Sequence, residues 1–208
     1  MMKRITLLAL VVMLVPVFAF GLEVTVGARA GLGHFGAWGE DYAETVDDLD
    51  ASRALSLGYT VGAYGSFALI DMFAVQPELW YTSGGYTLEA DGGDLSFTAR
   101  TLEAPVLGKL RFGIGPAKVI GFLGPNFRFK VGNFETDVDG DTVEQEDVKS
   151  AVIGSVVGAG AEFNLAVVVL SADLRYYLDF MPWDDSDAES DVKDQSARLT
   201  VGVGFPLL

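Results

Sequence analysis

The 208-residue sequence has no cysteine, one histidine and few basic residues. The lack of cysteine excludes disulfide scaffolds, zinc–thiolate sites, thiol catalysis and lipid attachment at an N-terminal cysteine. Its 14 Lys and Arg residues face 29 Asp and Glu residues, a formal net charge of −15. Such a chain offers no basic surface to a nucleic acid, so we expect no nucleic-acid partner. Half of the residues are nevertheless apolar, which excludes a disordered chain.

Residues 1–21 have the features of a secretory signal peptide. Two basic residues precede an uncharged apolar run over 5–20, and Ala19 and Gly21 have the small-residue spacing that signal peptidase requires. The alternative is a transmembrane anchor, but the run is shorter than the ~20 residues that a helix needs to cross a bilayer. We therefore expect cleavage after Gly21 and an exported domain over 22–208.

The rest of the sequence alternates between apolar and polar residues with a period of two. In 22–33, for example, the even positions are apolar, while the odd positions are polar, charged or glycine. This period predicts a β-strand with one apolar face. Eight such segments and no helix are predicted: 22–33, 55–69, 73–82, 96–112, 117–131, 151–163, 168–180 and 197–207.

The connections between these segments alternate in length. The stretches 34–54, 83–94, 132–149 and 181–195 are long and polar, whereas the links near Asp71, Gly113–Gly115 and Asn164–Leu165 are short. The long stretches hold 22 of the 29 acidic residues. Long connections at one end and short turns at the other are typical of outer-membrane barrels. We predict an all-β, eight-stranded antiparallel up-and-down transmembrane β-barrel in the outer membrane of a Gram-negative-type envelope, in contact with its lipid.

The charged positions of the strands fall on one face, which the barrel would turn inward. We expect a lumen charge network of Arg29, Glu78, Glu103, Lys109, Arg111, Lys118, Arg128, Lys130, Glu162, Asp173, Arg175, Asp179 and Arg198. An eight-stranded barrel is just wide enough for side chains to fill it, so ion pairs are expected to plug the lumen without a cofactor. Lys118 is expected beside Glu162, and Glu103 near Asn126 and Arg128. A porin-like channel for small solutes is the alternative.

A soluble secreted ligand-binding barrel, such as a lipocalin, would also alternate, but with its apolar face inside. Three features favour the membrane barrel. The strands reach the ~9–11 residues that cross a bilayer, the connections alternate in length, and glycine is abundant on the charged face. Small residues beside long charged ones suit a narrow, filled lumen.

Three segments resemble a known family. Leu102-Glu103-Ala104-Pro105-Val106-Leu107-Gly108-Lys109-Leu110-Arg111-Phe112, Gly121-Phe122-Leu123-Gly124-Pro125 and Leu174-Arg175-Tyr176 are similar to strands of the outer-membrane β-barrel domain family that includes PorT-like proteins. The resemblance implies an architecture rather than an activity, and it implies the barrel-assembly machinery as a partner. Outer-membrane barrels usually end on an outward-facing aromatic residue that this machinery recognises. Here Phe205 and Leu207 have outward parity, and Leu208 follows as one extra residue.

His34 is the sole candidate for a catalytic base, because it is the only histidine. It has outward parity at the end of the first strand, and no serine stands out as its nucleophilic partner. We interpret it as an interfacial residue alongside Phe35 and Trp38, and we expect no enzymatic activity.

The acidic connections suggest divalent cations as partners. Asp137, Asp139 and Asp141 alternate as the carboxylates of a Ca²⁺ loop do, but Thr142 and Val148 stand where an EF-hand has its glycine and bidentate glutamate. A second acidic run, over 184–191, has no fixed spacing. We expect a solvated anionic surface that divalent ions can bridge to anionic neighbours, rather than a dedicated metal site.

Aromatic residues cluster towards both ends of the strands, as in the interfacial girdles of membrane barrels. Tyr81, Tyr86 and Trp183 are expected at the outer end, and Phe67, Phe73 and Phe112 at the inner turns. Trp80 has inward parity, and we expect it to pack inside the plug.

Overall fold

The computed structural model of the chain describes residues 23–38, 52–54, 56–90, 93–132, 134–138, 141–145, 149–183 and 193–207. Its strands are β1 (Glu23–Trp38), β2 (Ser52–Ala54), β3 (Ser56–Ile70), β4 (Phe73–Ala90), β5 (Gly93–Glu103), β6 (Val106–Ile114), β7 (Ala117–Lys130), β8 (Phe134–Val138), β9 (Asp141–Gln145), β10 (Ala151–Asn164), β11 (Val169–Asp179) and β12 (Lys193–Pro206). Among these residues no helix is long and apolar enough to span a membrane. The expected signal peptide lies outside the described residues.

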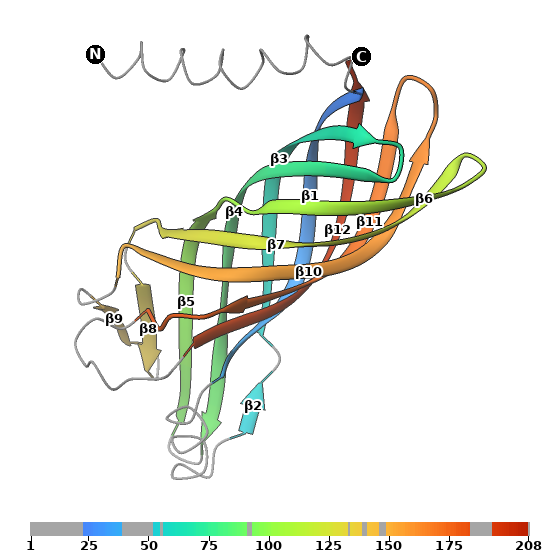
Figure 1. Cartoon of the computed structure of the whole chain (residues 1–208). Helices are drawn as coiled ribbons and strands as arrows, with labels where there is room; N and C mark the ends of the chain where they lie inside the picture. Colours follow the sequence, from blue (N-terminus) through green and yellow to red (C-terminus); the bar gives the residue numbers. More distant parts are fainter. Residues whose placement is uncertain are drawn as a thin grey trace, which may run out of the picture.

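The strands close into an eight-stranded barrel (Figure 1). We call each of the eight strand positions around the barrel a wall. Each wall pairs antiparallel with the next, and β1 closes the ring by pairing with β12 from Thr25↔Pro206 to Trp38↔Lys193. One wall consists of β5 and β6 in succession, and both pair with β4. The predicted strand 96–112 is therefore interrupted, at Ala104 and Pro105, because proline has no N–H to donate to a ladder. The eight-stranded barrel is confirmed.

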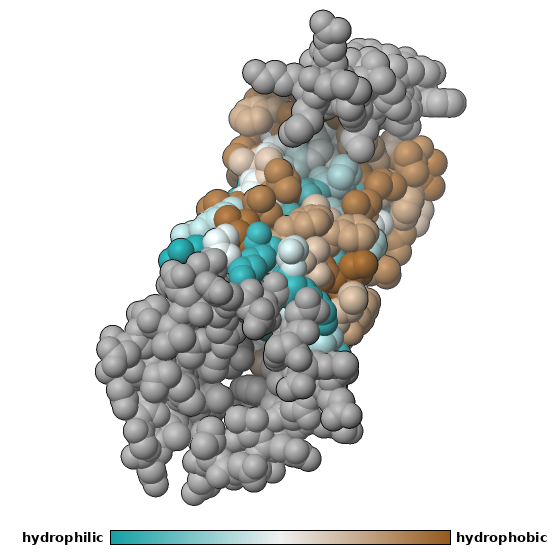
Figure 2. Space-filling view, turned by 90° about the vertical axis from the view of Figure 1, so that its left-hand side faces the viewer, coloured by the Kyte–Doolittle hydropathy of each residue, from teal (hydrophilic) through white to brown (hydrophobic). Residues whose placement is uncertain are grey.

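Burial alternates along the strands in the sense opposite to that of a soluble protein. Large apolar side chains lie on the outside, and Leu57 and Leu123 are 77% and 68% exposed. Lys109, Glu103 and Arg175, in contrast, are almost completely buried in the interior. On the face shown in Figure 2, apolar residues cover much of the barrel wall. The period-two pattern therefore places the charged face inside.

Glycines on the inner face leave room for large side chains on neighbouring strands. A Cβ atom on Gly62 would lie 2.7 Å from the indole of Trp80, and one on Gly84 would lie 2.6 Å from the ring of Phe35. Gly158 likewise lies against the ring of Phe122. The expectation that small residues make space in a narrow lumen is confirmed at these positions.

The short connections gather at one end of the barrel, which we call the short-turn end (Figure 1). Asp71–Met72 joins β3 to β4, and Gly115–Pro116 joins β6 to β7, with Gly115 at a φ of +64° that suits glycine. The β10–β11 turn contains Ala166, whose N–H donates to Oδ1 of Asn164 at 3.0 Å. The opposite end carries the long connections, as the sequence predicts.

Three of the predicted long connections, 34–54, 83–94 and 132–149, contain strands. Strands β4 and β5 stay paired through Ala90↔Gly93, well beyond the predicted loop start at residue 83. Strands β8 and β9 form a hairpin beside β5, and β2 pairs with β4. We call the outer parts of these five strands the extension. Residues 85–90 still alternate, but their apolar residues, such as Tyr86 and Leu88, have the parity of the inward-facing Trp80. The apolar set therefore changes parity after residue 82, which made the continuing strand look like a loop.

Candidate functional site in the barrel interior

The structure places the predicted lumen charges inside the barrel. Eleven of the thirteen residues are buried, and the exceptions, Lys118 and Lys130, are half-buried. Every buried member stands on an inward-facing position of its strand. Their ion pairs form three neighbouring groups. A central group lies between a second group, nearer the long connections, and a third group at the short-turn end.

The central group is organised by Arg175 on β11. Its guanidinium donates two hydrogen bonds to Glu78 on the opposite wall, at 2.5 and 3.1 Å, and Nε donates to Asp173 at 2.6 Å. The rings of Trp80 and Phe122 lie 5.0 and 5.1 Å from its Cζ. Trp80 is 1% exposed and donates its indole N–H to Glu78 at 2.6 Å, which confirms it as a packed interior residue.

Asp173 links this group to the first strand. It accepts hydrogen bonds from Arg29 and, at 2.6 Å, from the hydroxyl of Thr200. The Arg29 guanidinium also stacks 4.7 Å from the centre of the Tyr64 ring. The carboxylate therefore serves two arginines, as a buried charge needs several partners in a low dielectric.

The second group lies nearer the long connections. Arg198 donates two hydrogen bonds to Glu103, at 2.7 and 2.9 Å, and Arg128 lies 3.4 Å from the same carboxylate. The predicted proximity of Glu103 and Arg128 is therefore confirmed. Arg128 also pairs with Asp179 and, at 3.2 Å, with Asp194.

The sequence predicts Trp183 in the outer aromatic girdle, but the structure places it inside the barrel. It is 6% exposed, stacks 5.2 Å from the guanidinium of Arg128 and donates its indole N–H to Asp179 at 3.3 Å. The backbone N–H of Lys149 donates a hydrogen bond to the carbonyl of Trp183 at 2.8 Å. Trp183 thus covers the second group instead of facing lipid. Phe35 is likewise an interior residue, stacked 4.9 Å from Arg198, and the interfacial interpretation of it was wrong.

The third group faces the short-turn end. Lys109 donates to Glu162 at 2.6 Å and to Gln76 at 2.5 Å, and Gln76 donates in turn to Glu78 at 2.5 Å. Lys118 stands directly opposite Glu162 in the β7–β10 register, as predicted. The ion pair of that carboxylate, however, is made with Lys109, which reaches it across the lumen.

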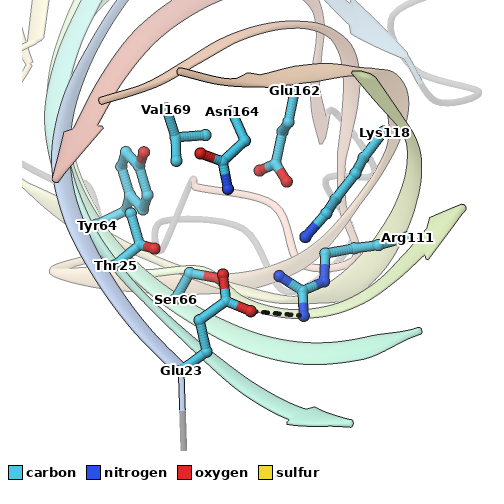
Figure 3. Close-up of a pocket in the computed structure, with 9 residues that line it drawn as sticks. All are labelled: Glu23, Thr25, Tyr64, Ser66, Arg111, Lys118, Glu162, Asn164 and Val169. Atoms are coloured by element: carbon cyan, nitrogen blue, oxygen red, sulfur yellow. Dashed lines mark ion pairs between the residues drawn. The ribbon is translucent and has the colours of Figure 1, made fainter. Parts of the chain in front are cut away.

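A small cavity of about 20 Å³ opens below this third group (Figure 3). Its lining residues come from the ends of six strands: Glu23, Thr25, Tyr64, Ser66, Arg111, Lys118, Glu162, Asn164 and Val169. The predicted lumen residues Arg111 and Lys118 contribute here rather than to the network above. A volume of this size holds about one water molecule or one small functional group.

Several interior residues were missed at the sequence level because they are neutral. Gln76 relays between Lys109 and Glu78, while Tyr177 stacks 3.9 Å from Arg198. Both have inward parity, so parity applied to polar and aromatic residues would have found them. Asp194 was assigned to a loop, and its contact with Arg128 had no signal in the pattern.

The candidate base and the acidic residues were the possible sites of catalysis and metal binding. His34 lies on the outer face, as predicted, and its Nδ1 is 3.3 Å from the backbone carbonyl of Ser56. No group of three metal-ligating residues occurs within the described part of the chain. The acidic run 184–191 lies outside the described residues, as do the side chains of Asp137, Asp139 and Asp141.

The comparison with protein families decides between the two kinds of barrel that alternation allows. The profile of a family described as outer membrane protein beta-barrel domain matches residues 18–205. The chain belongs to this family. Membership places the barrel in the outer membrane and its apolar wall against lipid, and it overturns the alternative of a soluble secreted barrel.

Solved barrels share the fold at low sequence identity. Over 88% of this chain and 96% of the other, Neisserial surface protein A is 17% identical, with a TM-score of 0.50. The outer membrane protein OprG from Pseudomonas aeruginosa is 11% identical over 89% of this chain and 96% of its own, with a TM-score of 0.54. No curated protein matches the sequence significantly.

Proposed function

We propose that this family member is a non-enzymatic barrel with a plugged lumen, which acts through its extracellular surface. The observation that carries the proposal is the continuity of the three ion-pair groups. Lys109 and Gln76 connect to Glu78, Glu78 to Arg175, and the Arg198–Glu103–Arg128 group follows beneath Trp183. Side chains thus occupy the lumen at successive levels.

The ion pairs support a permanent plug. Each carboxylate of the central and second groups lies within ion-pair distance of at least one arginine, and three of these contacts are bidentate. Breaking a buried pair leaves an uncompensated charge, which costs roughly 3–5 kcal/mol. Opening a path for ions would require breaking several pairs together.

The surface role is supported by where the remaining charge lies. The four long connections predicted from the sequence hold 22 acidic residues, and the extension continues the sheet beyond the barrel on the same side. Outer-membrane barrels carry their long connections outside the cell. A partner from the medium would meet this acidic surface first, so cationic or cation-bridged partners fit it best.

Solute uptake into liposomes tests the plug. Vesicles containing the refolded protein should swell no faster in arabinose than empty vesicles. A matched variant with Trp80→Gly and Arg175→Gly removes the central side chains and should admit the sugar, which shows that the assay detects an open lumen. Swelling with the unmodified protein at the rate of that variant would favour the porin-like channel instead.

A further inference from the structure

The cavity at the short-turn end is a vestibule with no passage through the described part of the barrel above it. It is lined by the first residues of β1 and the last residues of β10, and the Lys109–Glu162 pair lies directly above it. Because short turns of outer-membrane barrels face the periplasm, the vestibule opens to the periplasm. A group that enters there meets side chains instead of a passage.

Two cationic groups converge in this vestibule. Figure 3 shows the guanidinium of Arg111, from β6, and the ammonium of Lys118, from β7, extending into the same space inside the barrel. Lys118 makes no ion pair with a described residue, and the nearby carboxylate of Glu162 is held by Lys109 at 2.6 Å. Two like charges that line one small cavity repel each other, and a bound anion relieves that repulsion.

Arg111 is buried but poorly paired. It is 6% exposed, its Nη2 reaches the carbonyl of Ile70 only at 3.4 Å, and Glu23 lies 3.9 Å away. Its Nε is buried and has no hydrogen-bond partner within the described residues. A buried guanidinium with an unused donor is costly, and its planar fork matches the geometry of a carboxylate or a phosphate.

We propose that the vestibule binds a single carboxylate group that enters from the periplasm. Arg111 and Lys118 supply the positive charge, while the hydroxyl groups of Thr25 and Ser66 line the same space. A volume of about 20 Å³ leaves room for one small group only, and a carboxylate is smaller than a phosphate. The carboxylate can belong to a free small acid or to the C-terminal end of a peptide.

Glu23 is the competitor that this site must displace. Its side chain is 41% exposed, and its ion pair with Arg111 is long, so it can turn away from the vestibule. We therefore expect Glu23→Gln to strengthen binding of the carboxylate, because it removes the competing negative charge. Arg111→Gln and Lys118→Gln should weaken binding, because each removes a positive charge from the site. Lys130→Gln, at the other end of β7, is the matched control.

Calorimetry and NMR on the folded protein in detergent micelles test the proposal at constant ionic strength. The probes are acetate, an acetylated tripeptide with a free C-terminus and the same tripeptide amidated. Acetate or the free-acid peptide should shift the Arg111 Nε–H signal saturably, and the amide should not. Affinity should fall about tenfold in Arg111→Gln, which corresponds to one charge-assisted hydrogen bond.

The two acid probes separate the sources. Acetate binding alone indicates a site for small free acids, and binding of the free-acid peptide indicates a peptide terminus. Heat-modifiable gel mobility shows which variants are folded, and if Arg111→Gln is not, Lys118→Gln and Glu23→Gln decide. Equal affinity in the unmodified protein, Lys118→Gln and Glu23→Gln would overturn the proposal. The plug is tested separately, because a conducting lumen with an intact carboxylate site would contradict the plug alone.

Discussion

Arg175 and Arg198 stand directly opposite each other on β11 and β12, yet each is neutralised by a carboxylate from the far wall. Arg175 holds Glu78 and Arg198 holds Glu103, each through two hydrogen bonds. Two adjacent like charges on one face of a sheet are unfavourable without such partners. The stability of the barrel therefore depends on contacts across the lumen as well as on neighbouring strands.

Removal of one partner should destabilise the barrel strongly. Glu78→Gln leaves Arg175 beside Arg198 with one carboxylate fewer, and we expect a loss of roughly 3–5 kcal/mol in the free energy of unfolding. Urea unfolding in lipid vesicles, followed by tryptophan fluorescence, measures this loss. The double variant Glu78→Leu/Arg175→Leu removes both charges and should recover much of it. A single variant as stable as the unmodified protein would show that the pair contributes nothing.

Glycines on the inner face should be intolerant of substitution. Gly158→Val places a side chain against the ring of Phe122, whereas Gly121→Val, on the neighbouring strand, points into open space. We expect Gly158→Val to reduce the yield of folded barrel, because overpacking costs typically about 1–3 kcal/mol, and Gly121→Val to have little effect. Heat-modifiable mobility after refolding compares the two. Similar losses in both would contradict the assignment of faces.

A charge on the outer wall should be costly in proportion to its depth. Leu123 is 68% exposed near the middle of β7, and Leu123→Arg should cost roughly 2–4 kcal/mol in a bilayer. Val167→Arg, in the short turn between β10 and β11, should cost almost nothing. Reversible folding into vesicles provides the free energies. Equal values at the two positions would mean that Leu123 does not face lipid.

The N-terminal segment yields a prediction that needs only the mature protein. Cleavage after Gly21 removes the apolar run and leaves Leu22 as the first residue. N-terminal sequencing of protein purified from outer membranes should therefore begin Leu-Glu-Val-Thr-Val. A chain that starts at Met1 would instead indicate an uncleaved anchor.

The sequence predicts the faces of the barrel well and its partners less well. Parity alone places Lys109, Glu103 and Arg175 inside. Successive side chains of a strand point to opposite faces, so the charged face must point inward once the apolar face meets lipid. It does not pair Lys109 with Glu162 or Arg198 with Glu103. These residues stand on walls that are not neighbours, so register says nothing of their contact across the lumen.

The sequence predicts neither the extension nor the position of Trp183. Strands β4 and β5 stay paired beyond residue 82 and still alternate, but the apolar residues of β4 change parity there, so a pattern read for a single apolar face ends too early. Trp183 follows the end of β11, where an aromatic residue is equally suited to a girdle or to the lumen. The stacking on Arg128 decides between them, and that contact depends on the tertiary structure.

The most direct test of the plugged lumen is single-channel recording from the purified protein in a planar bilayer. The ion pairs around Arg175 and Arg128 predict no stable unitary conductance, with steps appearing only when the central side chains are removed. Well-resolved, reproducible channel steps from the unmodified protein would contradict the account.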